Sequence, residues 1–332
     1  MGTPPRGHMR IGVVTPRDLP DDELITFAQT VERLGFDHLW MVEDLGYKGG
    51  FTQAAAVLAT TDHVRVGIGI LPVAVRNPVF TAMEAATLAR TFPGRLTLGL
   101  GHGMPQWMRQ IGEGVSSPLT LLAETLVAVR GLLAGDTLTM NGRYVRLDGV
   151  RLEVAPEIAP PVIAGVRGPR SLMVSGEHAD GTLLSEPVTV PYLTAARELT
   201  RQGTARRRSE QGSRHDLYAY NVAYVHDDPG TARDQVREAV AVFGQPDWWP
   251  HIEPLPFAAD FRALANTVTH ANELARALPG DWIDQLAVVG TPDMVRGRLG
   301  DLAAAGAAES SFFVSAKVTA SQLRRLAQAV LA

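Results

Sequence analysis

Short apolar runs return along the chain at a nearly constant spacing. The first four begin near Arg10, Asp37, Val64 and Arg95, so they lie 27, 27 and 31 residues apart. Each interval has room for one strand, one helix and two short loops, which is the repeating βα unit of a parallel sheet. The runs are almost continuously apolar, as expected for strands covered on both faces. The predicted strands are 10–14, 38–42, 65–71, 96–100, 161–164, 182–185, 218–225 and 310–314.

Helix signals fill the intervals between these strands. Residues 21–34 carry apolar side chains at helical spacing and end at Gly35, and residues 78–90 open with a proline. Further helices are predicted at 119–133, 169–177, 231–242, 292–305 and 320–331. Eight βα units favour a closed (β/α)₈ TIM barrel over an open doubly wound sheet, because the first βα turn, Thr15 to Pro20, lacks the glycines of a dinucleotide motif.

Two segments depart from the βα alternation. Residues 137–154 contain Asn141-Gly142, a strong hairpin signal, and predict a β-hairpin insertion after strand four. Residues 245–280 contain four prolines and are too long for an ordinary connection. They predict a helical insertion between strands seven and eight, over the barrel mouth or at a subunit contact. Residues 1–9 are interpreted as a leader or tag remnant, and 10–332 as a single barrel domain.

The composition of the chain excludes several kinds of active site and argues against several kinds of partner. The chain has no cysteine, which excludes disulfides, thiolate nucleophiles and cysteine-bound zinc, and its nine histidines lack metal-ligand spacing. The net charge of −4 comes from interspersed acidic and basic residues, so no nucleic-acid partner is expected. No apolar run reaches the roughly 18 residues of a membrane span and no secretory signal is seen, so we expect a cytoplasmic protein. Arg206-Arg207-Arg208 is interpreted as a solvated helix end.

Active sites of TIM barrels lie at the carboxyl ends of the strands, so the residues after each strand are candidates. Glu43 and Asp44 follow strand two, where one carboxylate would hold a cofactor ring and the other would transfer a proton. The alternative is a solvated pair or a helix cap. After strand three, an apolar segment runs directly into Asn77-Pro78, which indicates either functional irregular backbone or an ordinary strand end with an Asn77 cap.

Two glycine-rich loops complete the candidate site. His102 lies between Gly101 and Gly103, where the glycines would let a planar ligand approach the backbone; the alternative is a structural histidine. After strand five, the loop from Gly165 to Pro169 precedes a helix and contains Arg167, so it predicts an anion site for a phosphate-bearing cofactor or, alternatively, an ordinary tight turn.

Taken together, these segments resemble the bacterial-luciferase-like flavin and deazaflavin oxidoreductases over nearly the whole chain from Arg10. Glu43-Asp44-Leu45 leading into Gly49-Gly50-Phe51-Thr52 is most similar to the methylenetetrahydromethanopterin reductase-like branch, which uses coenzyme F420. The other segments that carry the resemblance are Gly35-Phe36-Asp37-His38-Leu39-Trp40, Asn77-Pro78, Gly94-Arg95-Leu96-Thr97-Leu98-Gly99-Leu100-Gly101, Gly168-Pro169-Arg170-Ser171-Leu172, Gly176-Glu177-His178-Ala179-Asp180-Gly181 and Val289-Gly290-Thr291-Pro292.

The resemblance implies a (β/α)₈ barrel with the ring of F420 at the carboxyl-end mouth. It places a non-prolyl cis peptide near Val73, Ala74 and Val75, and the phosphate-bearing tail on Gly165, Val166, Arg167, Gly168 and Pro169. The reductases of this branch carry a glutamate in the first strand, where this chain has only Ile11 to Val14, so a pterin substrate is not expected.

The expected activity is hydride transfer between C5 of F420 and the carbon of a C=N, C=C or C=O group in a small organic substrate, with Glu43, Asp44 or His102 handling the proton. Trp107, Trp248 and Trp249 are candidate substrate walls, although Trp248 and Trp249 fit an insertion core or subunit contact equally well. The alternatives are an FMN-dependent monooxygenase, supplied by a separate cofactor reductase, and a non-catalytic flavin-binding protein. We expect a homodimer.

Overall fold

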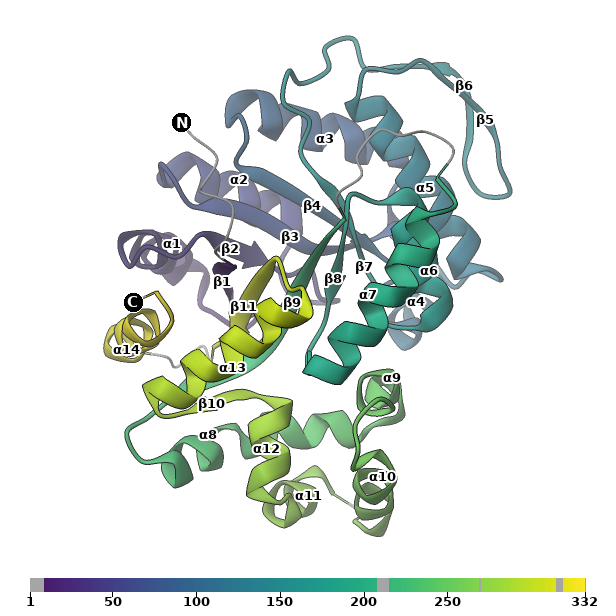
Figure 1. Cartoon of the computed structure of the whole chain (residues 1–332). Helices are drawn as coiled ribbons and strands as arrows, with labels where there is room; N and C mark the ends of the chain where they lie inside the picture. The colour runs from purple at the N-terminus through teal and green to yellow at the C-terminus, as the bar shows by residue number, and fades with distance from the viewer. Residues whose placement is uncertain (1–8, 208–214, 269, 315–318, 332) are drawn as a thin grey trace.

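Eight parallel strands close into a barrel in the computed structural model, which describes residues 9–207, 215–268, 270–314 and 319–331 (Figure 1). Pairing follows chain order and closes where the last barrel strand pairs with the first, so the predicted (β/α)₈ barrel is confirmed and the open sheet is excluded. Residues 1–8 of the expected leader lie outside the described residues. The barrel strands are β1 (Arg10–Val14), β2 (His38–Met41), β3 (Arg65–Pro72), β4 (Leu96–Gly101), β7 (Val162–Gly165), β8 (Gly181–Leu184), β9 (Asp216–Val225) and β11 (Glu309–Phe313).

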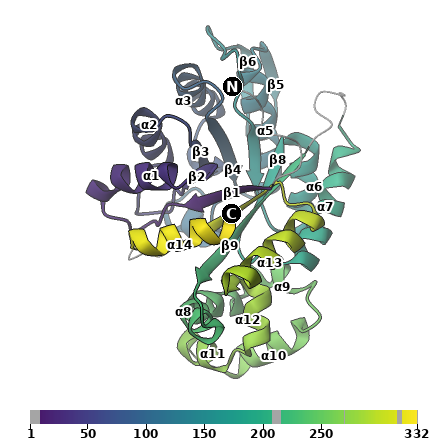
Figure 2. The same cartoon turned by 60° about the vertical axis from the view of Figure 1, so that its left-hand side comes forward.

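Helices surround this barrel on all sides in the two views (Figures 1 and 2). Most begin with a proline in the first turn, and Asn77 caps one of them by accepting the Val79 N–H at 2.9 Å. No helix in the described residues is both long and apolar enough to cross a bilayer. The surrounding helices are α1 (Leu24–Arg33), α2 (Gly50–Thr60), α3 (Pro78–Thr91), α5 (Pro118–Leu133), α6 (Pro169–His178), α7 (Val190–Thr204), α8 (Pro229–Ala241), α13 (Pro292–Ala305) and α14 (Ala320–Val330).

The barrel interior is filled by side chains, with a charged cluster near its amino-terminal end. Trp40 packs edge-on against Tyr218 and Tyr220, each with ring centroids 5.6 Å away. The Trp40 indole N–H donates to the fully buried Glu309 at 2.7 Å, and Nδ1 of His38 lies 2.9 Å from the same carboxylate. Burial alone would raise the pKa of Glu309, but His38, Arg10 and Trp40 lower it to about 2. This carboxylate is therefore a structural anion of the barrel floor.

Both departures from the βα alternation form separate structures. The 137–154 segment contains β5 (Leu138–Asn141) and β6 (Arg146–Val150), an antiparallel hairpin. The 245–280 segment is helical, with η4 (Pro246–Trp248), α9 (Trp249–Ile252), α10 (Ala258–Thr267) and α11 (Ala271–Ala277), and is followed by α12 (Gly280–Leu286). These helices enclose their own apolar core with α8, around Phe243, Phe261 and Ile283.

A strand that the sequence analysis did not predict connects this insertion to the barrel. The first part of β9 pairs with β8 and β11, but its last residues, Ala223 to Val225, pair with β10 (Val288–Gly290) instead. Expecting only eight strands was wrong on this point, because Val288 to Gly290 is too short to give a strand signal of its own. The ten-residue β9 therefore belongs to both the barrel and the insertion.

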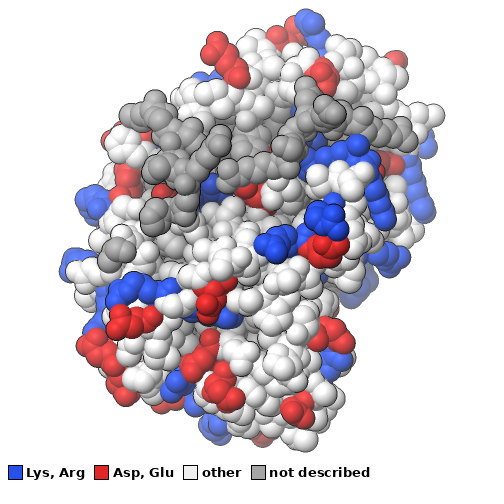
Figure 3. Space-filling view, viewed as in Figure 1, with Lys and Arg blue, Asp and Glu red and all other residues white. Residues whose placement is uncertain are grey.

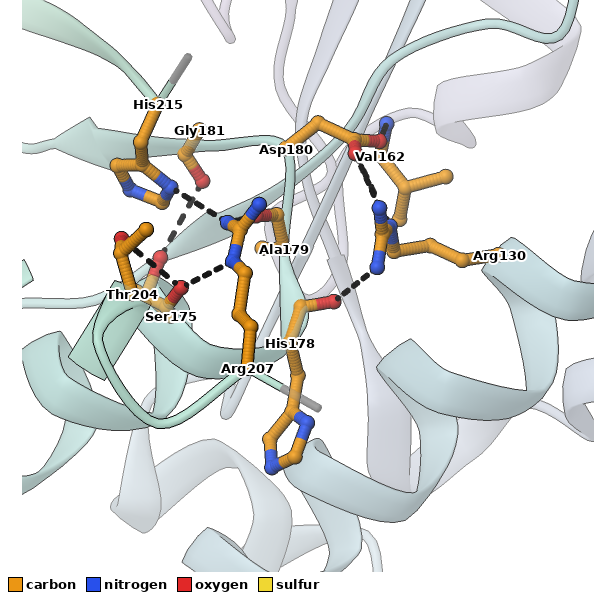
Figure 4. Close-up of polar contacts among 11 residues, drawn as sticks. Arg130, Val162, Ser175, His178, Ala179, Asp180, Gly181, Thr204, Arg207 and His215 are labelled. Atoms are coloured by element: carbon orange, nitrogen blue, oxygen red, sulfur yellow. Dashed lines mark hydrogen bonds and ion pairs between the residues drawn. The ribbon is translucent and has the colours of Figure 1, made fainter. Parts of the chain in front are cut away.

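Arginines fix the end of α6 to the starts of β7 and β8 (Figure 4). Arg130 pairs with Asp180 at 2.6 Å, and the other Asp180 oxygen accepts the Val162 N–H at 2.9 Å. Arg207 donates to the carbonyls of Gly176 and Ala179. Interpreting Arg207 as solvated was therefore wrong, because its guanidinium satisfies the carbonyl groups at the end of α6; Arg208 lies outside the described residues.

Candidate active site

A cavity of about 620 Å³ opens where β3, β4 and β7 end, at the carboxyl-end face of the barrel. Five of the predicted site residues line it: Val73, Ala74, His102, Gly103 and Arg167. Its remaining walls are mostly apolar and come from the β4 loop, α4 (Pro105–Gln110), the α4–α5 connection and α5. The lining residues outside the predicted set include Met104, Met108, Val115, Pro118, Leu121, Arg109, Glu113 and Asp247. A cavity of this size and polarity suits an organic cofactor or substrate.

The non-prolyl cis peptide lies inside β3, between Gly69 and Ile70. Placing it near Val73, Ala74 and Val75 was therefore wrong: those three residues form a short 3-10 helix, η2 (Val73–Val75), and Val75 is exposed. The pairing register between β3 and β4 shifts between Ile68 and Leu71, so the strand itself carries the irregularity. Ile70 remains partly exposed at the mouth of the barrel.

Glycines of β4 and β7 make room for the Ile70 side chain. A Cβ at Gly165 would lie 2.3 Å from Ile70 Cγ2, and a Cβ at Gly101 would lie 3.0 Å from Ile70 Cδ1. The first distance is too short for two carbon atoms, and the second would require Ile70 to shift by a few tenths of an ångström. The approach of a planar ligand to the Gly101–Gly103 loop stays a prediction, and Ile70 is the side chain that packs against Gly101 and Gly165. The partly exposed Ile70 side chain, packed against these glycines, forms an apolar surface that we call the Ile70 platform.

Glu43 connects three segments around the mouth. Its Oε2 accepts from Arg76 Nη2 at 2.7 Å and from the Gly50 N–H at 2.6 Å, and its Oε1 lies 3.0 Å from Arg76 Nη2. This carboxylate therefore neutralises an arginine beyond η2 and caps the N-terminus of α2. Its predicted role in the chemistry stays a prediction, and the structure gives both of its oxygens a structural partner.

Asp44 and His102 make fewer polar contacts than Glu43. Asp44 lies 3.3 Å from Arg17 Nη1, and both side chains keep contact with solvent. Nε2 of His102 lies 3.0 Å from the Ser171 hydroxyl at the start of α6. Burial lowers the pKa of His102, although the nearby Pro118 carbonyl partly opposes this. The imidazole is therefore neutral at pH 7 and serves as a hydrogen-bonding group in the cavity wall.

The loop from Gly165 to Pro169 precedes α6 and joins the cavity to the insertion. Arg167 lines the cavity, donates to the Asp247 carbonyl at 3.0 Å and places its guanidinium 5.2 Å from the Trp248 ring centre. Val166 is buried, whereas Gly168 has open space around it and Pro169 begins α6. A cation beside free backbone N–H groups at a helix N-terminus can hold an anionic group.

The three predicted substrate tryptophans have different surroundings. Trp248 contacts Arg167 at the edge of the cavity. Trp249 donates to the Gly244 carbonyl at 3.4 Å and lies beside Arg262, which agrees with the alternative of an insertion core. Trp107 lies on α4, whose residues Pro105, Met108 and Arg109 line the cavity instead. In the described ranges, no group of three His, Asp or Glu side chains is placed to hold a metal ion.

Two polar residues were missed in the sequence analysis, one at the mouth and one in the barrel interior. Glu186 follows β8, and burial raises the pKa of its carboxyl to about 7. The Tyr220 hydroxyl is buried and has no hydrogen-bond partner among the described residues. The strand-end rule that selected Glu43 would have selected Glu186 too, since it stands two residues after the apolar run ending at Leu184. No local signal marks Tyr220, which lies within a strand.

The comparisons with known proteins agree with this architecture. The family model described as luciferase-like monooxygenase matches residues 9–309. The chain is 26% identical over 293 residues to a 5,10-methylenetetrahydromethanopterin reductase of Methanolobus tindarius, covering 86% of this chain and 88% of that protein. It is 28% identical over 250 residues to an F420-dependent hydroxymycolic acid dehydrogenase of Mycobacterium tuberculosis, covering 70% of this chain and 67% of that protein.

A solved structure shows the same fold. The coenzyme F420-dependent tetrahydromethanopterin reductase from Methanopyrus kandleri superposes with a TM-score of 0.83 at 18% identity, covering 98% of this chain and 99% of that one. Since the family model extends over most of the chain and the barrel has the expected closed topology, the chain belongs to the luciferase-like monooxygenase family.

Proposed function

We propose that the protein is a coenzyme F420-dependent oxidoreductase acting on a small organic substrate with a C=N, C=C or C=O group. The observation that carries this proposal is the cavity at the strand ends, which is mostly apolar and is lined by Arg167 beside the N-terminus of α6. We assign the ring to the apolar part next to the Ile70 platform, which precedes the lining residues Val73 and Ala74 in the chain. This combination suits a flat ring with an anionic tail. The names of the relatives that cover most of the chain favour F420 as that ligand.

The residues present fit such a cofactor. Val73 and Ala74 offer apolar contact beside the platform, His102 offers a hydrogen bond in the cavity wall, and Arg167 would hold a phosphate. When bound, F420 would supply or accept a hydride at C5. The apolar walls, including Met108 and Leu121, would exclude water and fix the substrate against one face of the ring. Asp44 and His102 remain candidates for contact with the substrate.

A side-by-side titration tests the cofactor. Purified protein is titrated with F420 and with FMN, and binding is followed by fluorescence quenching and calorimetry. We expect micromolar F420 binding and much weaker FMN binding. The reverse preference would overturn the proposal and favour the FMN-dependent monooxygenase that the family description suggests. Oxygen consumption with reduced FMN and a partner reductase would then be measured. Tight F420 binding without turnover on imines, enones or ketones would favour the non-catalytic alternative.

We also propose that the protein works in the cytoplasm as a homodimer. Phe80 and Met83 lie one helical turn apart on α3 and are 65% and 47% exposed. Large apolar side chains grouped on one helix face are typical of a surface that another protein covers. Light scattering coupled to size exclusion tests this, and a monomer at micromolar concentration would contradict it.

A further inference from the structure

The mouth of the barrel contains a carboxylate that the strand-end candidates above do not include. Glu186 lies two residues beyond β8 and is partly exposed to solvent. Its neighbours fix its position: the Val188 N–H donates to Asn221 Oδ1 on β9 at 3.0 Å, and the Pro187 carbonyl lies beside the buried His251 ring of the insertion. Residues of both the barrel and the insertion therefore fix the position of the segment that carries Glu186.

Glu186 differs from Glu43 and Asp44 in having no cation bound to it. Glu43 pairs with Arg76, and Asp44 pairs with Arg17. Among the described residues, no ion pair or side-chain hydrogen bond within the usual limits involves the Glu186 carboxylate. Arg167 is close enough to affect it, but its guanidinium is directed to Asp247 and Trp248. The carboxyl group is therefore free to exchange a proton with a ligand.

The charges around Glu186 keep both of its protonation states accessible. Burial raises the pKa of this carboxyl, and the charge of Asp44 adds to the increase. Its own backbone N–H, Arg167 and Arg17 act in the opposite direction and leave the pKa at about 7. His251, whose pKa burial lowers to about 3, contributes no charge from the insertion side. A group of this kind can donate and accept protons at neutral pH.

An independent observation indicates a ligand atom nearby. Tyr220 is only 3% exposed, and its buried hydroxyl has no partner among the described residues. A Cβ on Gly69 would lie 2.4 Å from this hydroxyl, so Tyr220 reaches the backbone beside the Ile70 platform. Glu186 follows β8 and Tyr220 lies on the neighbouring β9, where Leu184 pairs with Ala219, so both residues stand just beyond the same strand pair. Buried hydroxyls in proteins usually have a partner, and here a bound molecule would supply it.

We propose that Glu186 is the proton-transfer residue of the reaction, an inference that rests on the proposed function. In the reducing direction, a hydride adds to the electrophilic carbon and the electron pair of the double bond moves to the nitrogen, oxygen or neighbouring carbon. That atom takes the proton of the Glu186 carboxyl. The second hydrogen of the reduced cofactor leaves to solvent as a proton, and Glu186 regains one from solvent. Oxidation follows the reverse steps with Glu186 as the base.

Carbon-13 NMR of protein labelled at the glutamate side-chain carboxyl tests this without a substrate. The signal missing in Glu186→Gln identifies the residue, and Glu157→Gln on the exposed surface is the matched control. We expect the Glu186 signal of wild type and Glu157→Gln to titrate near pH 7, and to shift when F420 is added. Titration at the ordinary value of a glutamate, about 4.3, would overturn the proposal, as would a signal that F420 leaves unmoved.

Turnover gives a second readout. The probes are 1-pyrroline, 2-cyclohexen-1-one and cyclohexanone with reduced F420. On whichever probe wild type reduces, Glu186→Gln should lower turnover by about 100-fold or more and remove the alkaline limb of the pH profile, while F420 affinity stays unchanged. Equal rates for the two variants would contradict the inference. Absence of F420 binding to wild type would instead contradict the proposed function, so the two failures are distinguishable.

Discussion

Replacing Gly165 with alanine should displace the Ile70 side chain that forms the Ile70 platform. The added Cβ would lie 2.3 Å from Ile70 Cγ2, more than 1 Å inside the roughly 3.5 Å at which two carbons make good contact. Either Ile70 or β7 must therefore move by about 1 Å. Overpacking of this kind costs about 1–3 kcal/mol. Because the displaced atoms form the proposed ring surface, we expect F420 affinity to fall by about tenfold, equivalent to about 1.4 kcal/mol.

Gly300→Ala is the control for this variant. Gly300 lies on the exposed face of α13, where a Cβ meets nothing within 4 Å, so F420 affinity should stay at the wild-type value and stability should not fall. Urea denaturation and F420 titration measure both quantities for each variant. The double variant Gly165→Ala/Ile70→Ala removes the clashing methyl and should destabilise by less than the sum of its single changes. Strict additivity, or wild-type behaviour of Gly165→Ala alone, would refute the reasoning.

Three further changes test other contacts. His251 is fully buried against Tyr192, and burial and Arg167 lower its pKa to about 3, so the folded protein keeps it neutral at pH 5 while the unfolded chain protonates it below about 6.5. Unfolding in urea should therefore show about 2 kcal/mol less stability at pH 5 than at pH 7 from this group, and His251→Phe should reduce that pH dependence. Arg76→Ala leaves Glu43 half-buried with only the Gly50 N–H, and should lower the free energy of unfolding by about 1–3 kcal/mol, whereas an unchanged urea midpoint would show that the ion pair contributes little. Arg167→Ala should weaken F420 binding by about tenfold with a smaller salt dependence, and calorimetry at two salt concentrations would detect the absence of either effect.

The spacing of apolar runs was enough to predict the barrel, because each βα unit is a local pattern and only a few closed arrangements satisfy eight of them. The strand-end rule and the family resemblance selected residues of which five line the cavity, and their roles stay predictions: Val73, Ala74, His102, Gly103 and Arg167. Contacts between distant strands have no such local signal. The fit of Gly165 to Ile70 joins residues about a hundred positions apart, and nothing near either residue indicates it.

The ion pair of Glu43 shows that charged contacts between distant residues are also hard to predict from sequence. A carboxylate at a strand end has the same sequence signature whether it faces a ligand or an arginine, and Arg76 lies 33 positions away. Arg207 shows the reverse case, because a run of arginines indicates solvent exposure until the end of a neighbouring helix supplies carbonyl partners. The cis peptide likewise lies at the register shift between β3 and β4, a pairing that depends on both strands.

The sharing of β9 between the barrel and the insertion limits how the two parts can change separately. Tyr220 stands in the barrel part of the strand, and Ala223 to Val225, a few residues further on, carry the pairing with β10. A shift of the insertion along this strand would be transmitted to the layer of aromatic rings below the mouth. A chimaera that carries the insertion of a relative should therefore keep the pairing of Val288 to Gly290 with β9. If that register changes, we expect Tyr220 and the rings packed against it to move as well.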